Sequence, residues 1–202
     1  MKKVWMFVVE GDSEEISLDI IIKHYFGVDK SIRFLVMNAD VVADKSPETK
    51  LINRIENELN VYKLRLNDLE RIIHIADVDG CFINESSIIE IPNSKIEYKT
   101  DTIECSNKIS IINRNDIKKN NFIRLYDTRF LNKGRKSIKY DFYFFSCNLE
   151  HALHNDSNLP DKHKIRKAED FSNSYADRIA DFIVLTRGLT LGLTRDELLI
   201  WL

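Results

Sequence analysis

The order in which apolar runs and amphipathic segments alternate is the strongest constraint on the fold. Residues 3–10 ("KVWMFVVE") are continuously apolar until an acidic end, which is typical of a strand buried on both faces of a parallel sheet. Residues 31–40 and 70–80 have the same character. Between them, residues 13–27 and 46–66 carry apolar side chains spaced by threes and fours, as amphipathic helices do. This alternation predicts an α/β fold with parallel strands and right-handed crossovers.

The second half of the chain departs from this alternation. Residues 86–104 alternate like a hairpin around "PNSK", and the following segment has mostly helical spacing. An aromatic-rich strand then leads into a helix start that Ser146 or Asn148 would cap. We therefore predict one domain with a mostly parallel central sheet flanked by helices. Its core would comprise about residues 2–81 and 138–160, with an inserted hairpin and helical segment at about 82–137 and C-terminal helices at about 165–202.

Composition narrows the function classes without choosing one. The 202 residues are 44% hydrophobic, enough for one sizeable core, and the net charge of -2 gives no overall attraction to nucleic acid or membranes. Three widely spaced cysteines without a C-x-x-C pair argue against a disulfide framework and a structural zinc site. No apolar stretch approaches the length of a membrane span. These features predict a cytoplasmic protein without a membrane partner.

Carboxylates follow three of the apolar strands. Glu10 follows the first, Asp77 and Asp79 end the third, and Glu150 comes just after the aromatic one. In an open α/β sheet, such strand ends share the edge where ligands bind. Converging carboxylates repel, so either one is protonated or a divalent cation neutralises them. Oxygen ligands without a cysteine or histidine cluster favour Mg²⁺ or Mn²⁺, which predicts phosphoryl transfer or phosphodiester hydrolysis.

Two short motifs carry a resemblance to a known family. "VVEGDSEE", followed about seventy residues later by "HIADVDG", resembles the topoisomerase-primase (Toprim) domain, where one strand ends in E-G-x-x-[DE] and a later one in D-x-D. "SCNLEHALH" is similar to a segment of Toprim nucleases of the overcoming-lysogenization-defect (OLD) type and of related small defence-associated proteins. The resemblance covers about residues 2–81 and 140–156 and implies a Toprim, Rossmann-like fold.

The resemblance also implies a site and an activity. Glu10, Asp77 and Asp79 would surround a divalent metal, with Glu14 in support and Glu150 completing the site. These five are the expected catalytic residues, and Glu10 is either a ligand or the general base. The implied activity is a Mg²⁺- or Mn²⁺-dependent nuclease acting on DNA or RNA, in phage defence or nucleic-acid processing. No ATPase segment accompanies the motifs, and the sequence leaves open whether a separate ATPase is a partner.

Basic residues gather in the segment from residue 108 to 139. Basic side chains would neutralise phosphates, and the interleaved Phe122, Tyr126 and Phe130 could stack on unpaired bases. The alternative is a solvated helix whose aromatic residues face the core. The candidate nucleic-acid-binding residues are Lys118, Lys119, Arg124, Arg129, Lys133, Arg135 and Lys136.

Two other functions fit parts of the sequence. "HIADVDGCF" also resembles the haloacid-dehalogenase phosphatase motif, in which Asp77 would be the phosphorylated nucleophile and Asp79 the general acid. That family places the motif near the N-terminus, whereas seventy-six residues precede Asp77 here. A non-catalytic module could instead retain the metal site to bind nucleic acid or a protein partner. The sequence leaves open DNA against RNA, one metal against two, and the oligomeric state, a homo-oligomer included.

Overall fold

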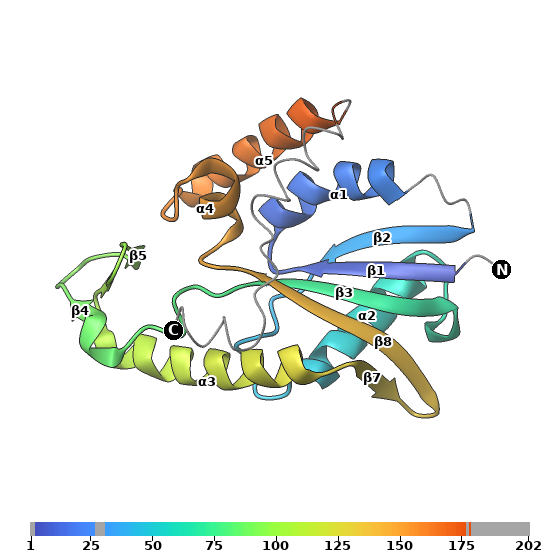
Figure 1. Cartoon of the computed structure of the whole chain (residues 1–202), viewed down its shortest axis with the longest axis horizontal. Helices are drawn as coiled ribbons and strands as arrows, with labels where there is room; N and C mark the ends of the chain where they lie inside the picture. The colour runs from blue at the N-terminus through green and yellow to red at the C-terminus, as the bar shows by residue number, and fades with distance from the viewer. Residues whose placement is uncertain (1–2, 27–30, 177, 179–202) are drawn as a thin grey trace.

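A five-stranded sheet forms the centre of the molecule (Figure 1). The computed structural model describes residues 3–26, 31–176 and 178. The strands in spatial order are β2 (Ile32–Asn38), β1 (Lys3–Val9), β3 (Leu69–Asp77), β8 (Lys136–Phe145) and β7 (Phe130–Lys133). The first four are parallel, and the edge strand β7 is antiparallel to β8. The predicted α/β fold with a mostly parallel sheet is confirmed.

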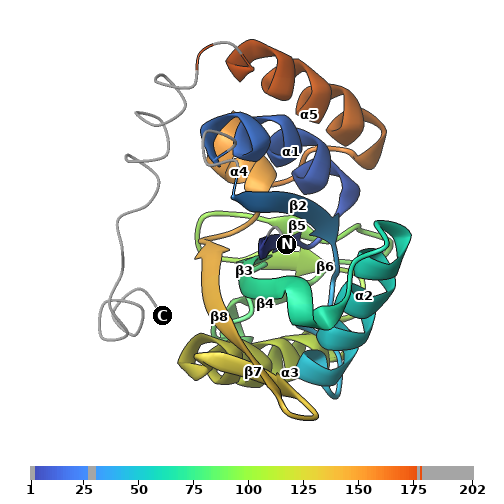
Figure 2. The ribbon, with the colours of Figure 1, turned by 90° about the vertical axis from the view of Figure 1, so that its right-hand side faces the viewer.

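Helices cover both faces of this sheet (Figures 1 and 2). Helix α1 (Asp12–Phe26) lies on one face with α5 (Asp161–Tyr175) packed against it. Helices α2 (Pro47–Val61) and α3 (Lys108–Asp127) lie on the other. Because strand side chains alternate between faces, β1, β2 and β3 each contribute to two hydrophobic clusters. The larger cluster lies under α2 and α3, and the smaller one lies under α1.

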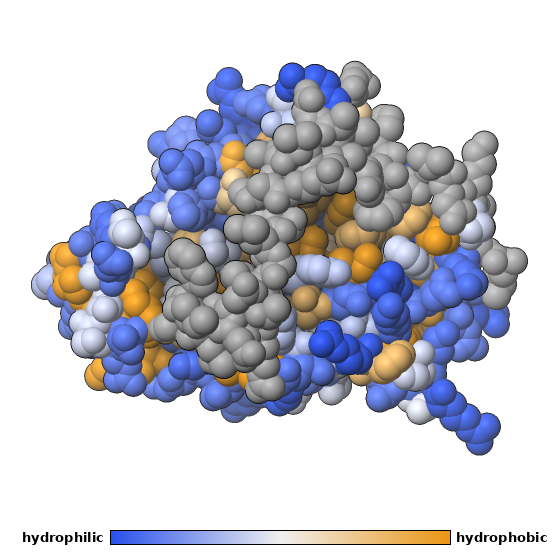
Figure 3. Space-filling view, in the orientation of Figure 1, coloured by the Kyte–Doolittle hydropathy of each residue, from blue (hydrophilic) through white to orange (hydrophobic). Residues whose placement is uncertain are grey.

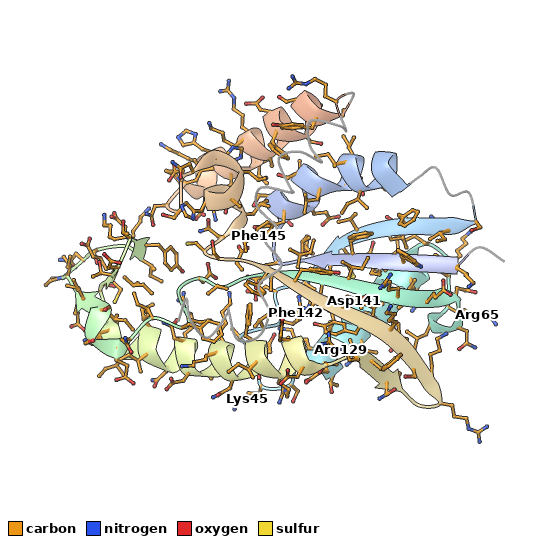
Figure 4. The ribbon with its side chains drawn as sticks, viewed as in Figure 1. Lys45, Arg65, Arg129, Asp141, Phe142 and Phe145 are labelled. Atoms are coloured by element: carbon orange, nitrogen blue, oxygen red, sulfur yellow. The ribbon has the colours of Figure 1, made fainter. Side chains whose placement is uncertain are left out.

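Aromatic side chains join α3 to the sheet. Phe122 of α3 is fully buried, and its ring centre lies 4.9 Å from that of Phe142 on β8, in an edge-to-face arrangement. Figure 4 shows Phe142 between β8 and α3. The ring centres of Phe82 and Phe144 lie 5.5 and 5.2 Å from that of Phe122 and complete the contact. Helix α3 is therefore part of the main body of the fold, although its sequence lies within the predicted insertion.

Helix α2 begins where predicted and ends earlier. Pro47 occupies its first turn, where the missing amide hydrogen is not needed. The sequence predicts a helix to residue 66, but the helix ends at Val61. Lys63 has a φ of +57°, and the Leu64 amide donates to the Leu59 carbonyl at 2.9 Å, which closes the helix in a left-handed turn.

The predicted hairpin around "PNSK" is wrong. Strands β4 (Ile88–Glu90), β5 (Glu97–Tyr98) and β6 (Ile103–Cys105) form a small sheet in which β6 is central, parallel to β4 and antiparallel to β5. A 3₁₀ turn, η2 (Glu85–Ser87), precedes β4, and another, η1 (Leu66–Asp68), precedes β3. The parallel pairing of β4 with β6 places Ile88 opposite Ile103 and buries both side chains. The alternation of apolar and polar residues in the sequence is compatible with this pairing and with a hairpin, so it cannot distinguish the two. At this end of the molecule, hydrophobic side chains gather on the surface, where Ile89, Ile91 and Ile96 are exposed (Figure 3).

The C-terminal part begins with a short helix, α4 (Leu149–His154). Asn148 caps it, because its side-chain oxygen accepts from the His151 amide at 2.9 Å. Helix α5 starts at Asp161, earlier than the predicted residue 165. The rest of the predicted C-terminal helical region, residues 177 and 179–202, lies outside the described residues. Among the described helices, none is both long enough and apolar enough to cross a membrane.

Candidate metal centre

The five predicted acidic residues line one cleft at the carboxyl ends of the parallel strands. Strand β3 and the segment after β8 stay together beyond the sheet, because the amides of Val78 and Asp79 donate to the carbonyls of Phe145 and Cys147. Asp79 and Gly80 then turn the chain away with φ values of +50° and +63°. The cleft has a volume of about 580 Å³. Its outer walls come from the β4–β5 connection, β5 and the start of α5, and include Lys95, Tyr98 and Lys164.

Three of the five carboxylates form a compact group, which we call the acidic trio. Glu14, Asp77 and Glu150 are all buried, and each offers an oxygen within 4.8 Å of the others. The Ser13 hydroxyl lies 3.2 Å from Glu14 Oε2 and 3.0 Å from Glu150 Oε1. Lys164 Nζ lies 3.7 Å from Glu150 Oε1 at the rim. Buried carboxylate oxygens without nitrogen or sulfur donors are the ligand set that hard divalent cations prefer.

Burial and repulsion make Asp77 and Glu14 of the acidic trio costly to ionise. Burial raises the pKa of Asp77 well above its usual value, and the negative charges of Glu10 and Asp79 raise it further. Burial also raises the pKa of Glu14, with a further contribution from the charge of Glu150. A bound cation would remove both penalties, because it replaces lost hydration and neutralises like charges. The trio therefore fits a divalent ion.

The other two carboxylates, Glu10 and Asp79, contact a lysine from α3. Lys118 Nζ lies 2.7 Å from Asp79 Oδ2 and 3.3 Å from Glu10 Oε2, and only 5% of the lysine side chain is exposed. Burial raises the pKa of Glu10 to about 7, although the Lys118 ammonium opposes this effect. Within the described part of the chain, the buried Oε1 atom of Glu10 has no hydrogen-bond partner.

Lys118 remains charged in this position. Burial alone would lower the pKa of Lys118, but the charges of Glu10 and Asp79 outweigh burial and raise it above its usual value. Neighbouring α3 side chains fix the helix to the turn after β3. Arg114 donates to the Asp79 carbonyl at 3.1 Å, and Asn115 donates to the Gly80 carbonyl at 3.3 Å. These hydrogen bonds hold the part of α3 from which Lys118 reaches Glu10 and Asp79.

Gly11 leaves room for the Glu14 carboxylate. A Cβ atom at position 11 would lie 2.8 Å from Glu14 Oε2, closer than side chains tolerate. The side chain of Glu14 therefore turns back over the start of α1 toward Asp77 and Glu150. This geometry gives a physical reason for the glycine in the E-G-x-x-E motif.

The candidate nucleic-acid-binding residues are dispersed. Lys118 belongs to the carboxylate cluster, while Lys119 lies 5.7 Å over the Phe82 ring and Arg124 pairs with Glu48. Figure 4 shows Arg129 next to the start of β7. The other three, Lys133, Arg135 and Lys136, lie at the β7–β8 turn.

This β7–β8 turn lies far from the cleft. Strand β8 runs parallel to β1 and β3, so its first residue lies at the sheet edge opposite the carboxylates (Figure 1). Of the interleaved aromatic residues, Phe122 is in the core and the Tyr126 ring packs on Phe144, whereas Phe130 is exposed. The core alternative therefore holds for two of the three aromatic residues.

Sequence reasoning missed some of the side chains that surround the acids. Ser13 and Lys164 contact the acidic trio, and Lys118 has a position that its place in a basic run does not reveal. The adjacency of Ser13 to Glu14 was a usable signal, whereas no local pattern pairs residue 118 with residue 10.

The three cysteines are free. Burial raises the pKa of Cys81 to about 12 and that of Cys147 to about 11, so the thiols of Cys81 and Cys147 stay protonated.

Comparison with models of known protein families, with curated proteins and with solved structures finds no match. The geometry of the cleft is therefore the basis for assigning a function. Its features are an acidic trio suited to a hard cation, a carboxylate with a pKa near neutrality, and a buried ammonium between two acids.

Proposed function

We propose that the protein is a Toprim-like nuclease that uses Mg²⁺ or Mn²⁺ to hydrolyse phosphodiester bonds of DNA or RNA. The observation that carries this proposal is the acidic trio, whose three buried carboxylates lie within 4.8 Å of one another at the strand ends. Glu14, Asp77 and Glu150 would hold the ion. Such an ion polarises a phosphoryl oxygen and lowers the pKa of bound water.

The remaining residues of the cleft take complementary roles. Glu10, with a pKa of about 7, is suited to accept a proton from the attacking water at neutral pH. Lys118 holds Glu10 and Asp79 in place through its two ion pairs. Lys95 and Lys164 line the outer walls, where they would contact the phosphates of a polymeric substrate.

Cleavage of labelled single- and double-stranded DNA and RNA, with Mg²⁺, Mn²⁺ or chelator, tests the proposal. We expect metal-dependent cutting that is lost in Glu14→Gln, Asp77→Asn and Glu150→Gln. The matched control is Asp170→Asn, which removes an exposed carboxylate on α5 and should cut normally. Cutting in the presence of chelator, or by Asp77→Asn, would contradict the proposal.

The same experiment separates the two alternatives when a phosphate monoester is added as a substrate and Glu10→Gln as a variant. A haloacid-dehalogenase-like phosphatase would hydrolyse a phosphate monoester, lose activity in Asp77→Asn and retain it in Glu14→Gln, since Asp77 would be the nucleophile. A non-catalytic module would bind Mn²⁺ and nucleic acid without cutting either polymer. Only a nuclease would require Glu10, Glu14 and Glu150 together with Asp77 for cutting a phosphodiester.

A further inference from the structure

Lys118 is an unusually enclosed cation. Only 5% of its side chain is exposed, and its ammonium contacts two carboxylates at 2.7 and 3.3 Å. Lysine is almost never fully buried unless it is paired, because the ammonium loses its hydration. Glu10 and Asp79 therefore act here as the ligands of a cation that belongs to the chain itself.

This ammonium lies next to the acidic trio, because its partners Glu10 and Asp79 line the same cleft as the carboxylates of the trio. Asp77 is a member of the trio, and its negative charge also acts on Lys118, together with the charges of Glu10 and Asp79. Conversely, the charges of Glu10, Asp79 and Glu14 all act on Asp77. Asp77 is thus a member of the trio that also interacts with the lysine-paired carboxylates. Two-metal centres hold their ions only about 4 Å apart, so carboxylates that adjoin in this way could serve two ions.

Helix α3 holds the ammonium in this place. Arg114 and Asn115 bind the turn that carries Asp79. One turn beyond the lysine, Asn121 donates to the carbonyls of Val42 and Asp44 at 2.8 and 2.6 Å. Hydrogen bonds on both sides of Lys118 therefore fix the helix, so the ammonium is a built-in part of the cluster.

We propose that the Lys118 ammonium occupies the second cation position of the cluster, so that the protein binds one divalent ion, at Glu14, Asp77 and Glu150. This inference rests on the proposed metal centre. Lys118 is a positioning residue, which supplies a fixed positive charge and orients Glu10 and Asp79. In a two-metal centre, the second ion supplies this positive charge. Here the Lys118 ammonium would supply it at any metal concentration.

The number of Mn²⁺ ions bound per chain at saturation tests the inference, measured by equilibrium dialysis and by the electron paramagnetic resonance signal of free Mn²⁺. We expect one ion in the wild type and two in Lys118→Met, which frees Glu10 and Asp79. Lys119→Met is the matched control, because it makes the same change at the next residue, which lies outside the cluster, and should bind one ion.

The outcomes separate this inference from the proposed function. Two ions in the wild type, or one ion in folded Lys118→Met, would overturn the role of Lys118 and leave the metal centre intact. No ion in the wild type would overturn the metal centre, and the inference with it. If Lys118→Met does not fold, Asp79→Asn provides the test. It should retain the single ion, which Asp77→Asn loses, and loss of the ion from Asp79→Asn would overturn the inference.

Discussion

The Ser13 hydroxyl lies 3.0 Å from the Glu150 carboxylate, although 137 positions separate the two residues. Ser13 is in the first turn of α1, and Glu150 is in the first turn of α4. The contact therefore joins the starts of two helices at the strand ends. The amide groups at the start of α1 also favour negative charge nearby, which partly offsets the repulsion within the acidic trio.

Removing this hydroxyl should weaken the site. Ser13→Ala leaves Glu14 and Glu150 without a shared partner, so we expect a loss of about 1 kcal/mol in the free energy of unfolding without metal. Urea denaturation with and without Mn²⁺ measures the effect. Ser174→Ala alters an exposed serine on α5 and should leave the free energy of unfolding unchanged, both with and without Mn²⁺. Equal effects of the two substitutions would argue against a specific role for Ser13.

Gly11 provides a test of geometry rather than charge. Gly11→Ala brings a Cβ within 2.8 Å of Glu14 Oε2, so the carboxylate must move away. We expect about a tenfold loss of Mn²⁺ affinity, as for other residues that orient ligands, with a small change in stability. Gly134→Ala is the complementary control. Gly134 has a φ of +58° and open space around it, so that substitution should cost about 1 kcal/mol of stability and leave Mn²⁺ affinity unchanged.

The raised pKa of Glu10 predicts a pH dependence of stability without metal. Its pKa rises from 4.5 to about 7, so the folded state binds the extra proton between these values. Stability from this proton is fully present below pH 4.5 and is lost as the pH rises through about 7, by at most about 3 kcal/mol. Asp77, Glu14 and His74 titrate in both proteins, so the test is the difference between them. In thermal unfolding, the stability of the wild type relative to Glu10→Gln should fall as the pH rises from 4.5 to about 7. A wild type and variant with parallel pH curves would contradict the shift.

The sequence predicted the parts of the fold that local pattern determines. Buried strands of a parallel sheet are continuously apolar, and the runs at 3–10, 31–40 and 70–80 match β1, β2 and β3 closely. The pairing in the small sheet was not predictable, because Ile88 and Ile103 are fifteen residues apart and many registers bury similar side chains.

The candidate site shows the same division. The carboxylates could be predicted to gather because each follows a strand of one parallel sheet, and all five line the cleft. Their division into an acidic trio and a lysine-paired couple depends on α3, which enters from a segment that the sequence shows as an insertion. The aromatic residues of that segment turn it toward the sheet and carry Lys118 with it.

The position of basic residues relative to the cleft predicts how nucleic acid binds. Lys95 and Lys164 line the cleft, whereas Lys133, Arg135 and Lys136 lie at the opposite sheet edge. We expect Lys95→Gln and Lys164→Gln each to weaken binding and to lower the salt slope by about 1, as loss of one phosphate contact does. The triple change of the opposite-edge residues to Gln should leave affinity and slope unchanged. Fluorescence anisotropy at several salt concentrations measures the affinity and the salt slope. Weaker binding by the triple variant, with unchanged binding by Lys95→Gln and Lys164→Gln, would place the binding surface at the β7–β8 turn instead.

The buried pair of His74 and Tyr140 predicts a second pH dependence, of opposite sign. His74, the only histidine of the strand that carries Asp77, is fully buried with its Nδ1 2.7 Å from the Tyr140 hydroxyl. Burial lowers the pKa of His74 from 6.5 to about 3, so the unfolded chain binds a proton that the folded one does not. Stability should therefore fall as the pH drops from about 6.5 toward 3. Replacing both residues with Phe should remove this fall, which acid titration of unfolding measures; an unchanged fall would assign it to other groups.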